Sequence, residues 1–291
     1  MKSIYSLVTD IQHMVSKESW IDEQVRIQIG NGIADALSHS ASQRGEGTKR
    51  TLRLSQMGSR CPKALWHSIH TPELGERLPA SAIIKYTYGH IIESLIIQMA
   101  KASGHEVVGE QDVVTLDGIV GHRDCVIDGC IVDVKSASSF SFQKFKDGSI
   151  ETSDTFGYLD QLDGYVVGSR NDPLVRVKDK GYLLAVDKTL GHLALHEHHI
   201  RERNILDRIR YYKEIVDLKE PPRCGCDTVA DGKSGNTKLD VKASYSAYKH
   251  CCFPGLRTFL YSSGPVYLSK VVRRPADHIK EIDAKGNVVY N

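Results

Sequence analysis

The stretch GHRDCVIDGCIVDVKSAS, residues 121–138, decides the fold that this sequence predicts. Two runs rich in β-branched and other apolar residues flank Asp128-Gly129, a dipeptide typical of two-residue hairpin turns. A turn at this point would place Asp124 directly opposite Asp133 on the neighbouring strand. The period-2 alternation of a strand then puts Lys135 on the same face as Asp133. The segment therefore predicts a β-hairpin that carries two carboxylates and one amine on a single face.

Two opposed carboxylates predict a bound cation. Like charges at directly opposite strand positions repel each other, and a divalent ion between them would remove the conflict. Oxygen ligands suit a hard ion, so we expect Asp124 and Asp133 to bind Mg²⁺ or Mn²⁺, with Lys135 beside the ion. The alternative for an isolated Asp-x-Lys is a surface hairpin with ordinary acidic and basic residues, but the apolar neighbours on this strand favour a buried or cleft-lining site.

The rest of the chain alternates between helical and strand patterns. Apolar residues recur at helical spacing within residues 4–15, 25–37, 82–102, 156–167 and 201–218. Strand patterns cover residues 107–135, 182–186 and 193–199, and in the last of these the alternation around His196 and His198 predicts one wet face. Polar, glycine-containing segments at residues 38–49 and 223–238 predict loops. This order predicts an α/β fold with a central mixed sheet flanked by helices.

Three parts are expected along the chain. Residues 1–50 would form an N-terminal helical element and linker, residues 51–220 the core, and residues 221–291 a small cysteine-containing lobe with a basic tail that packs on the core.

Composition narrows the class of protein. The chain has 291 residues, of which 41% are hydrophobic, and this excludes disorder as its main state. Its 38 basic and 36 acidic residues give a net charge of +2, so any site for a polyanion must be local. No apolar run approaches the ~20 residues that span a bilayer, and the first residues do not resemble a signal peptide, so we expect a cytoplasmic protein without membrane partners. Seven cysteines in such a chain favour reduced thiols or metal ligands over disulfides.

Four short motifs follow one another in the chain. They are Tyr88-Gly89-His90-Ile91-Ile92-Glu93, Asp124 within Gly-His-x-Asp, Asp133-Val134-Lys135, and Gln161-Leu162-Asp163-Gly164-Tyr165. His90 shares a helix face with Glu93, and Gln161 shares one with Tyr165. Taken together, the motifs resemble the PD-(D/E)XK nuclease superfamily, in the branch of the RecB and AddB nuclease domains and the CRISPR-adaptation exonucleases. The resemblance covers about residues 61–269 and is greatest to stand-alone exonucleases of tailed bacteriophages.

The resemblance implies a metal-dependent exonuclease that acts on single- or double-stranded DNA ends in recombination or end processing, in the host cytoplasm if the protein is phage-encoded. It implies metal binding by His90, Asp124, Asp133 and the carbonyl of Val134. It also implies a catalytic set of Glu93, Asp124, Asp133, Lys135, Gln161 and Tyr165. A single-strand-binding or annealing protein is a further expected partner. Two alternatives remain: a catalytically silent DNA-binding or recombination-partner module, and a structure-selective endonuclease of the same fold.

Contacts with DNA are expected close to the proposed catalytic strand. Because the net charge is nearly zero, phosphate binding must come from a local groove. The main candidates are Ser136, Ser138, Lys144, Lys146 and Tyr165. Further basic candidates are Arg201, Arg203, Lys270, Arg273 and Arg274.

The cysteines raise a second metal question. Relatives in this branch often bind a [4Fe–4S] cluster through one cysteine before the core, which Cys61 resembles, and three near the C-terminus. Ala243 and Ser246 stand where two of those three are expected, so the resemblance implies that the cluster is lost. Cys61 and Cys252 would then be neighbouring packing residues. A zinc site made by Cys224 and Cys226 with Cys251 or Cys252 is the alternative, although these spacings are tight for a tetrahedral ion.

Overall fold

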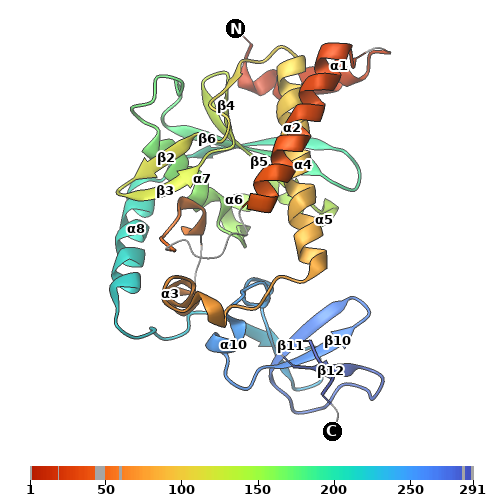
Figure 1. Ribbon diagram of the computed structural model, residues 1–291, viewed down its shortest axis with the longest axis vertical. Helices are drawn as coiled ribbons and strands as arrows, with labels where there is room; N and C mark the ends of the chain where they lie inside the picture. The colour runs from red at the N-terminus through yellow and green to blue at the C-terminus, as the bar shows by residue number, and fades with distance from the viewer. Residues whose placement is uncertain (1, 19, 43–49, 59–60, 284–285, 290–291) are drawn as a thin grey trace. The chain divides into compact units, whose positions relative to one another are not determined.

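The chain forms two compact units. A computed structural model describes residues 2–18, 20–42, 50–58, 61–283 and 286–289 (Figure 1). The first unit comprises Met1–Thr48, Leu52–Gly58 and Pro79–Ile209, and the second comprises Lys49–Thr51, Ser59–Leu78 and Arg210–Asn291. This division differs from the three parts expected from the sequence, whose boundaries lie at residues 50 and 220. The N-terminal helices belong to the unit of the central sheet, and residues 61–78 belong with the C-terminal part of the chain.

A five-stranded mixed sheet forms the centre of the first unit, as the sequence predicts. Its strand order is β1 (Val107–Val108), β4 (Cys125–Ile127), β5 (Cys130–Ala137), β6 (Lys180–Asp187) and β7 (Leu193–His199). Strands β5 and β6 run parallel, and the other neighbouring pairs are antiparallel. A separate hairpin of β2 (Val113–Leu116) and β3 (Ile119–His122) precedes β4.

The predicted hairpin turn is confirmed. Strand β4 pairs with β5 so that Ile127 lies opposite Cys130, across the turn at Asp128 and Gly129. Both turn residues have positive φ, 50° and 81°, which is the backbone conformation of a type I′ turn. Continuing this register by one residue beyond β4 brings Asp124 opposite Asp133.

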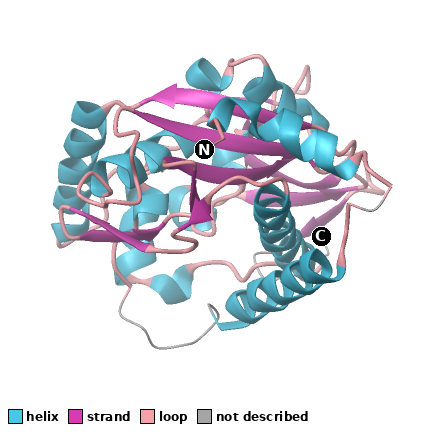
Figure 2. Cartoon of the chain, turned by 90° about the horizontal axis from the view of Figure 1, so that it is seen from above, coloured by secondary structure: helices cyan, strands magenta, loops and turns pink. Residues whose placement is uncertain are grey.

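Helices cover both faces of the central sheet (Figure 2). On one face, α1 (Leu7–Val15) and α4 (Ala80–Ala102) pack their apolar residues on even-numbered residues of β5 and β6, such as Val132 and Leu184. On the other face lie α5 (Ser139–Lys146) and α7 (Tyr158–Gly168), with the one-turn α6 (Ile150–Ser153) between them in sequence. Helix α2 (Glu23–Ser42) packs along α4. The helices therefore bury both sides of β5, the strand that carries the Asp-x-Lys motif.

The second unit contains a sheet that the sequence did not predict. It is antiparallel, in the order β12 (Lys280–Ile282), β10 (Arg257–Tyr261), β11 (Gly264–Lys270), β9 (Thr237–Leu239) and β8 (Thr228–Ala230). Helices α3 (Pro62–His70), α9 (Val241–Ser244) and α10 (Lys249–Cys252) belong to the same unit, and α8 (Glu202–Asp217) runs from the first unit into it.

Two predicted loops are partly wrong. Residues 223–238 include β8 and the start of β9, and α2 continues to Ser42, inside the predicted loop at residues 38–49; residues 43–49 lie outside the described part of the chain. The fold class itself is confirmed as α/β with a mixed sheet flanked by helices. In the described ranges, no helix has the length and apolar character needed to cross a bilayer.

Candidate functional site

Strand β5 carries a buried carboxylate with few partners. Asp133 is 1% exposed, and among the described residues its carboxylate oxygens have no hydrogen-bond partner apart from the ion pair with Lys135. The ammonium of Lys135 lies 2.5 Å from Oδ2 in an ion pair and 4.8 Å from the centre of the Tyr158 ring. Buried carboxylate oxygens are normally hydrogen-bonded or bound to a cation. Asp133 is therefore an acceptor whose remaining capacity fits a metal ion.

Two further carboxylates surround Asp133. Asp124 precedes β4, and its Oδ2 accepts a hydrogen bond of 2.7 Å from the backbone N–H of Val134. Burial and the charge of Asp133 raise the pKa of Asp124 well above its usual range. The same two causes raise the pKa of Glu93, on α4, to about 7. Because neighbouring charges disfavour the ionised forms of Asp124 and Glu93, a cation bound between these carboxylates would be favourable.

His90, Glu93 and Asp124 line one cavity of about 540 Å³ in the first unit. The Nδ1 atom of His90 is 3.9 Å from Oε2 of Glu93, and the side-chain amide of Gln111 donates a 2.8 Å hydrogen bond to Oε1. A cavity of this volume lies within the usual range for ligand sites. The opposite wall comes from α2, whose lining residues are Gln28, Asn31, Gly32 and Asp35. We did not predict these residues, because the polar positions of an amphipathic helix look alike whether they face solvent or a cavity.

Gln161 and Tyr165 lie together on α7, as their i,i+4 spacing predicts. The side-chain amide of Gln161 donates a hydrogen bond of 2.9 Å to the Tyr165 hydroxyl. Burial, followed by the charge of Asp133, raises the pKa of Tyr165, which is only 2% exposed. Gly121 makes room for this ring, since a Cβ atom there would lie 2.8 Å from Cε1 of Tyr165. Tyr165 thus supports the site from the protein interior and does not present its ring to solvent.

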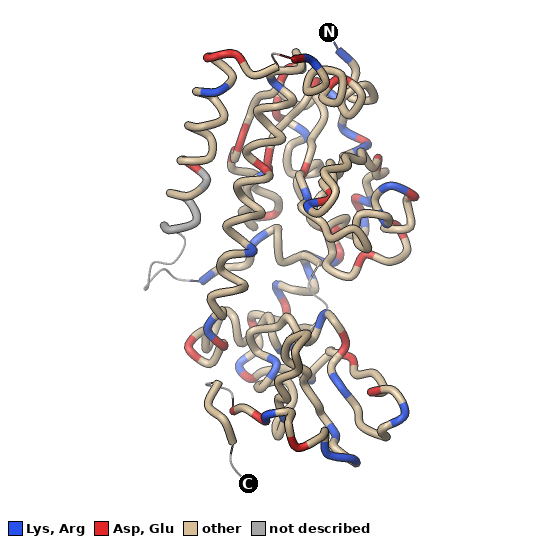
Figure 3. The backbone as a smooth tube through the Cα atoms, turned by 90° about the vertical axis from the view of Figure 1, so that its right-hand side faces the viewer, with Lys and Arg blue, Asp and Glu red and all other residues tan. Residues whose placement is uncertain are grey.

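The predicted DNA-contacting residues lie in different surroundings. Ser136 is half-buried near the end of β5, and the exposed Ser138 caps α5 by accepting a hydrogen bond from the Ser141 N–H. Lys144 donates to the Ser153 carbonyl at 2.9 Å, while Lys146 is exposed. Basic and acidic residues are interspersed along the backbone (Figure 3). Of the two predicted lysines on α5, Lys146 is therefore the one that faces solvent.

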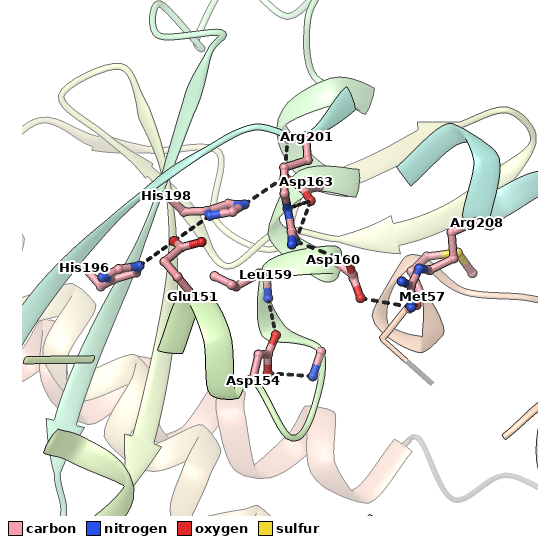
Figure 4. A network of polar contacts seen from close by, with 11 residues as sticks. Met57, Glu151, Asp154, Leu159, Asp160, Asp163, His196, His198, Arg201 and Arg208 are labelled. Atoms are coloured by element: carbon pink, nitrogen blue, oxygen red, sulfur yellow. Dashed lines mark hydrogen bonds and ion pairs between the residues drawn. The ribbon is translucent and has the colours of Figure 1, made fainter. Parts of the chain in front are cut away.

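A polar network holds α7, and with it Gln161 and Tyr165, against the sheet (Figure 4). His198 on β7 is 1% exposed and lies between two carboxylates, with Nδ1 2.7 Å from Glu151 and Nε2 3.0 Å from Asp163. Arg201 donates to the other oxygen of Asp163 at 3.0 Å, and Glu151 also contacts His196 at 2.8 Å. The expectation of a wet face for these histidines is wrong, because carboxylates from α6 and α7 cover it. Arg201, a predicted phosphate contact, is engaged in the same network.

The network predicts that stability depends on pH through His198. Burial alone lowers the pKa of His198, but its hydrogen bonds with Asp163 and Glu151 outweigh burial and raise it above 6.5. The stabilisation is therefore complete below the pKa that His198 has in the unfolded chain, and it is lost as pH rises through the pKa of His198 in the folded protein. We expect His198→Gln to reduce the free energy of unfolding more at about pH 6 than at about pH 8. Urea unfolding of both proteins measures this, and a pH-independent difference would contradict it.

Four cysteines of the second unit form a separate donor set. The sulfurs of Cys61, Cys224, Cys226 and Cys252 all lie within 4.8 Å of one another. The expected proximity of Cys61 and Cys252 is confirmed, with an Sγ–Sγ distance of 3.5 Å. The alternative zinc set named Cys224 and Cys226, which approach from the segment after α8, with Cys251 or Cys252, but it did not include Cys61. Ala243, at an expected cysteine position, packs instead with Leu239 and Leu256.

Comparisons with known proteins give little information. No family model matches the chain, and no curated protein matches it. Among solved structures, the crystal structure of SSO0001 is similar with a TM-score of 0.40 and 14% sequence identity, over 79% of this chain and 96% of that chain. The name SSO0001 indicates no activity.

Proposed function

We propose that the first unit is a Mg²⁺- or Mn²⁺-dependent deoxyribonuclease, an exonuclease that hydrolyses phosphodiester bonds at DNA ends. The observation that supports this most is the buried Asp133 carboxylate, which is paired with Lys135 and accompanied by the carboxylates of Asp124 and Glu93. Carboxylates grouped around one ion, with an amine beside them, suit metal-assisted hydrolysis of a phosphate ester. A role in phage recombination, with a single-strand-binding or annealing partner, belongs to the same proposal.

Asp124 and Asp133 would hold the ion, together with the carbonyl of Val134 and with His90 at the cavity side. When bound, the ion supplies an acidified water and neutralises charge on the scissile phosphate. Burial alone would lower the pKa of Lys135, but Asp133 and Asp124 outweigh burial and raise it. Lys135 therefore stays protonated at neutral pH, so it stabilises negative charge on the phosphate and does not act as a general base.

Glu93 is suited to accept the proton of the attacking water. A general base works best when its pKa lies close to the working pH, and the pKa of Glu93 is about 7. The hydrogen bond from Gln111 holds this carboxylate in one orientation.

Cleavage of linear and closed circular DNA tests the proposal. We expect loss of nucleotides from linear DNA with Mg²⁺ or Mn²⁺, no loss with EDTA, and intact closed circles. Lys135→Ala should lose this activity, while Lys188→Ala, an exposed lysine just beyond β6, should keep it. If the metal ions support no cleavage by the wild-type protein, the proposal is wrong. Cleavage of the circles would favour the structure-selective endonuclease instead.

Activity at limiting metal concentration should rise with pH. Because the pKa of Asp124, a proposed ligand, is raised, protons compete with the ion for this carboxylate, and protonation of Glu93, whose pKa is about 7, removes a nearby negative charge that favours the cation. The apparent metal affinity should therefore increase roughly tenfold between about pH 6 and about pH 8. Metal titrations of the cleavage rate at several pH values measure this. An affinity that stays constant over this range would contradict the arrangement of carboxylates described above.

A further inference from the structure

The four cysteines of the second unit come from three separate segments of the chain. Cys61 is the N-cap residue of α3, Cys224 and Cys226 follow α8 in a segment without regular structure, and Cys252 is the last residue of α10. Cys61 and Cys252 are buried, and the other two are half-buried. Their aliphatic and aromatic surroundings include Ala64, Tyr248 and Phe253. The fold therefore gathers four thiols at a point where three segments meet.

The spacing of the sulfurs matches a single tetrahedral ion. Zinc–sulfur bonds of about 2.3 Å in a tetrahedron separate neighbouring sulfurs by ~3.8 Å. The Sγ of Cys61 lies 3.5 Å from that of Cys252 and 3.9 Å from that of Cys224, and no pair in the set exceeds 4.8 Å. We propose that Cys61, Cys224, Cys226 and Cys252 bind one Zn²⁺ ion, which joins the three segments of the second unit.

The surroundings of the sulfurs support ligation by thiolates. The backbone N–H of Cys226 donates to the sulfur of Cys224 at 3.4 Å, as a spacing of two residues allows when the turn between them is tight. Cys61 lies at the N-terminus of α3, where the partial positive charge of the helix favours an anionic sulfur. The short Cys-x-Cys spacing thus allows the sulfurs of Cys224 and Cys226 to bind the same ion.

A four-iron cluster needs a wider arrangement. Its four cysteine sulfurs bind four different irons at the corners of a cube, and inorganic sulfides occupy the remaining corners. Ligands of a single ion instead share one centre and stand closer together, as these four do. All four positions are cysteine, so the set also suits zinc as a structural ion without an open position for a substrate.

Cys251 provides a matched control because it adjoins Cys252 on α10 and is not part of the set. The protein should be purified without oxygen from cells supplied with both iron and zinc, and its metal and inorganic sulfide measured. We expect one zinc per chain, no inorganic sulfide and no visible absorption. Cys252→Ala and Cys226→Ser should each lose most of the zinc, while Cys251→Ala should retain it. Asp133→Asn should also retain it, which separates this ion from the proposed nuclease site.

A measurement on the wild-type protein removes any dependence on whether the variants fold. A thiol reagent added stepwise should release zinc in proportion to the cysteines that react, and Co²⁺ exchanged into the protein should give the spectrum of a tetrahedral tetrathiolate. Iron together with inorganic sulfide would overturn the proposal in favour of a cluster. Purified protein that holds no metal and cannot take up Co²⁺ would overturn it in favour of four packed thiols.

Discussion

Asp133→Asn is expected to reduce metal-dependent cleavage of linear DNA by at least on the order of a thousandfold, equivalent to about 4 kcal/mol of transition-state stabilisation. The substitution keeps the volume of the side chain but removes the charge that would bind the ion. It also removes the partner that holds Lys135 at 2.5 Å. Both parts of the proposed catalytic arrangement are lost together. Single-turnover rates on end-labelled linear DNA, at saturating Mg²⁺ or Mn²⁺, measure the effect.

The folded state should tolerate this change. The Asp133 carboxylate is buried, and its charge disfavours the ionised forms of Asp124 and Glu93. Replacing it with a neutral amide takes the ion-pair partner from Lys135 but relieves that repulsion, and Asp124 and Glu93 remain to balance the charge of Lys135, so thermal unfolding without metal should occur close to the wild-type temperature. Asp217→Asn, at an exposed position, is the matched control and should cleave DNA like the wild type. Equal cleavage by Asp133→Asn and this control would refute the role given to Asp133.

Arg123→Ala should lower the free energy of unfolding by about 3–5 kcal/mol. Arg123 is 1% exposed, and its guanidinium contacts Asp112 at 2.8 Å, Asp172 at 2.6 Å and the Ser169 hydroxyl at 3.3 Å. Truncation would remove all three contacts and leave a cavity in the core of the first unit. Urea unfolding, followed by a signal from the whole chain, measures the loss.

The control for this prediction is another arginine of the same unit. Arg203 is 95% exposed, and its Nε atom lies 4.0 Å from Oδ2 of Asp207, which is the upper limit for an ion pair. Arg203→Ala should change the free energy of unfolding by less than ~0.5 kcal/mol. If Arg123→Ala cost no more than Arg203→Ala, the ion pairs of the buried Arg123 would not be what holds the chain next to Asp124.

Local signals in the sequence predicted the part of the site that lies close together along the chain. The Asp128-Gly129 dipeptide indicated the register of the hairpin, since these residues adopt the two positive φ angles of a two-residue type I′ turn. Helical spacing correctly grouped His90 with Glu93 and Gln161 with Tyr165. These pairs depend on backbone geometry alone, so no knowledge of tertiary packing was needed.

Contacts between distant segments could not be predicted in the same way. Nothing near Arg123 in sequence indicates that Asp172 would compensate its charge in the core, and nothing near His198 indicates Glu151 as its partner. The C-terminal sheet was missed because β8, β9 and β12 have three residues each and β8 is exposed throughout, so apolar alternation is weak there. The sulfurs of Cys61 and Cys224 meet across 163 residues, a contact that spacing motifs do not encode.

The discontinuous second unit has a consequence for biosynthesis. Its first segments leave the ribosome before the central sheet, but the strands they accompany, within Thr228 to Ile282, are made after it. Helix α3, with its buried residues Leu65 and Trp66, therefore cannot complete its packing until these strands have been translated. Any fragment that begins at residue 221 would lack α3. Expression of the C-terminal region alone should therefore give insoluble polypeptide. Co-expression with residues 50–78 should instead give a folded complex.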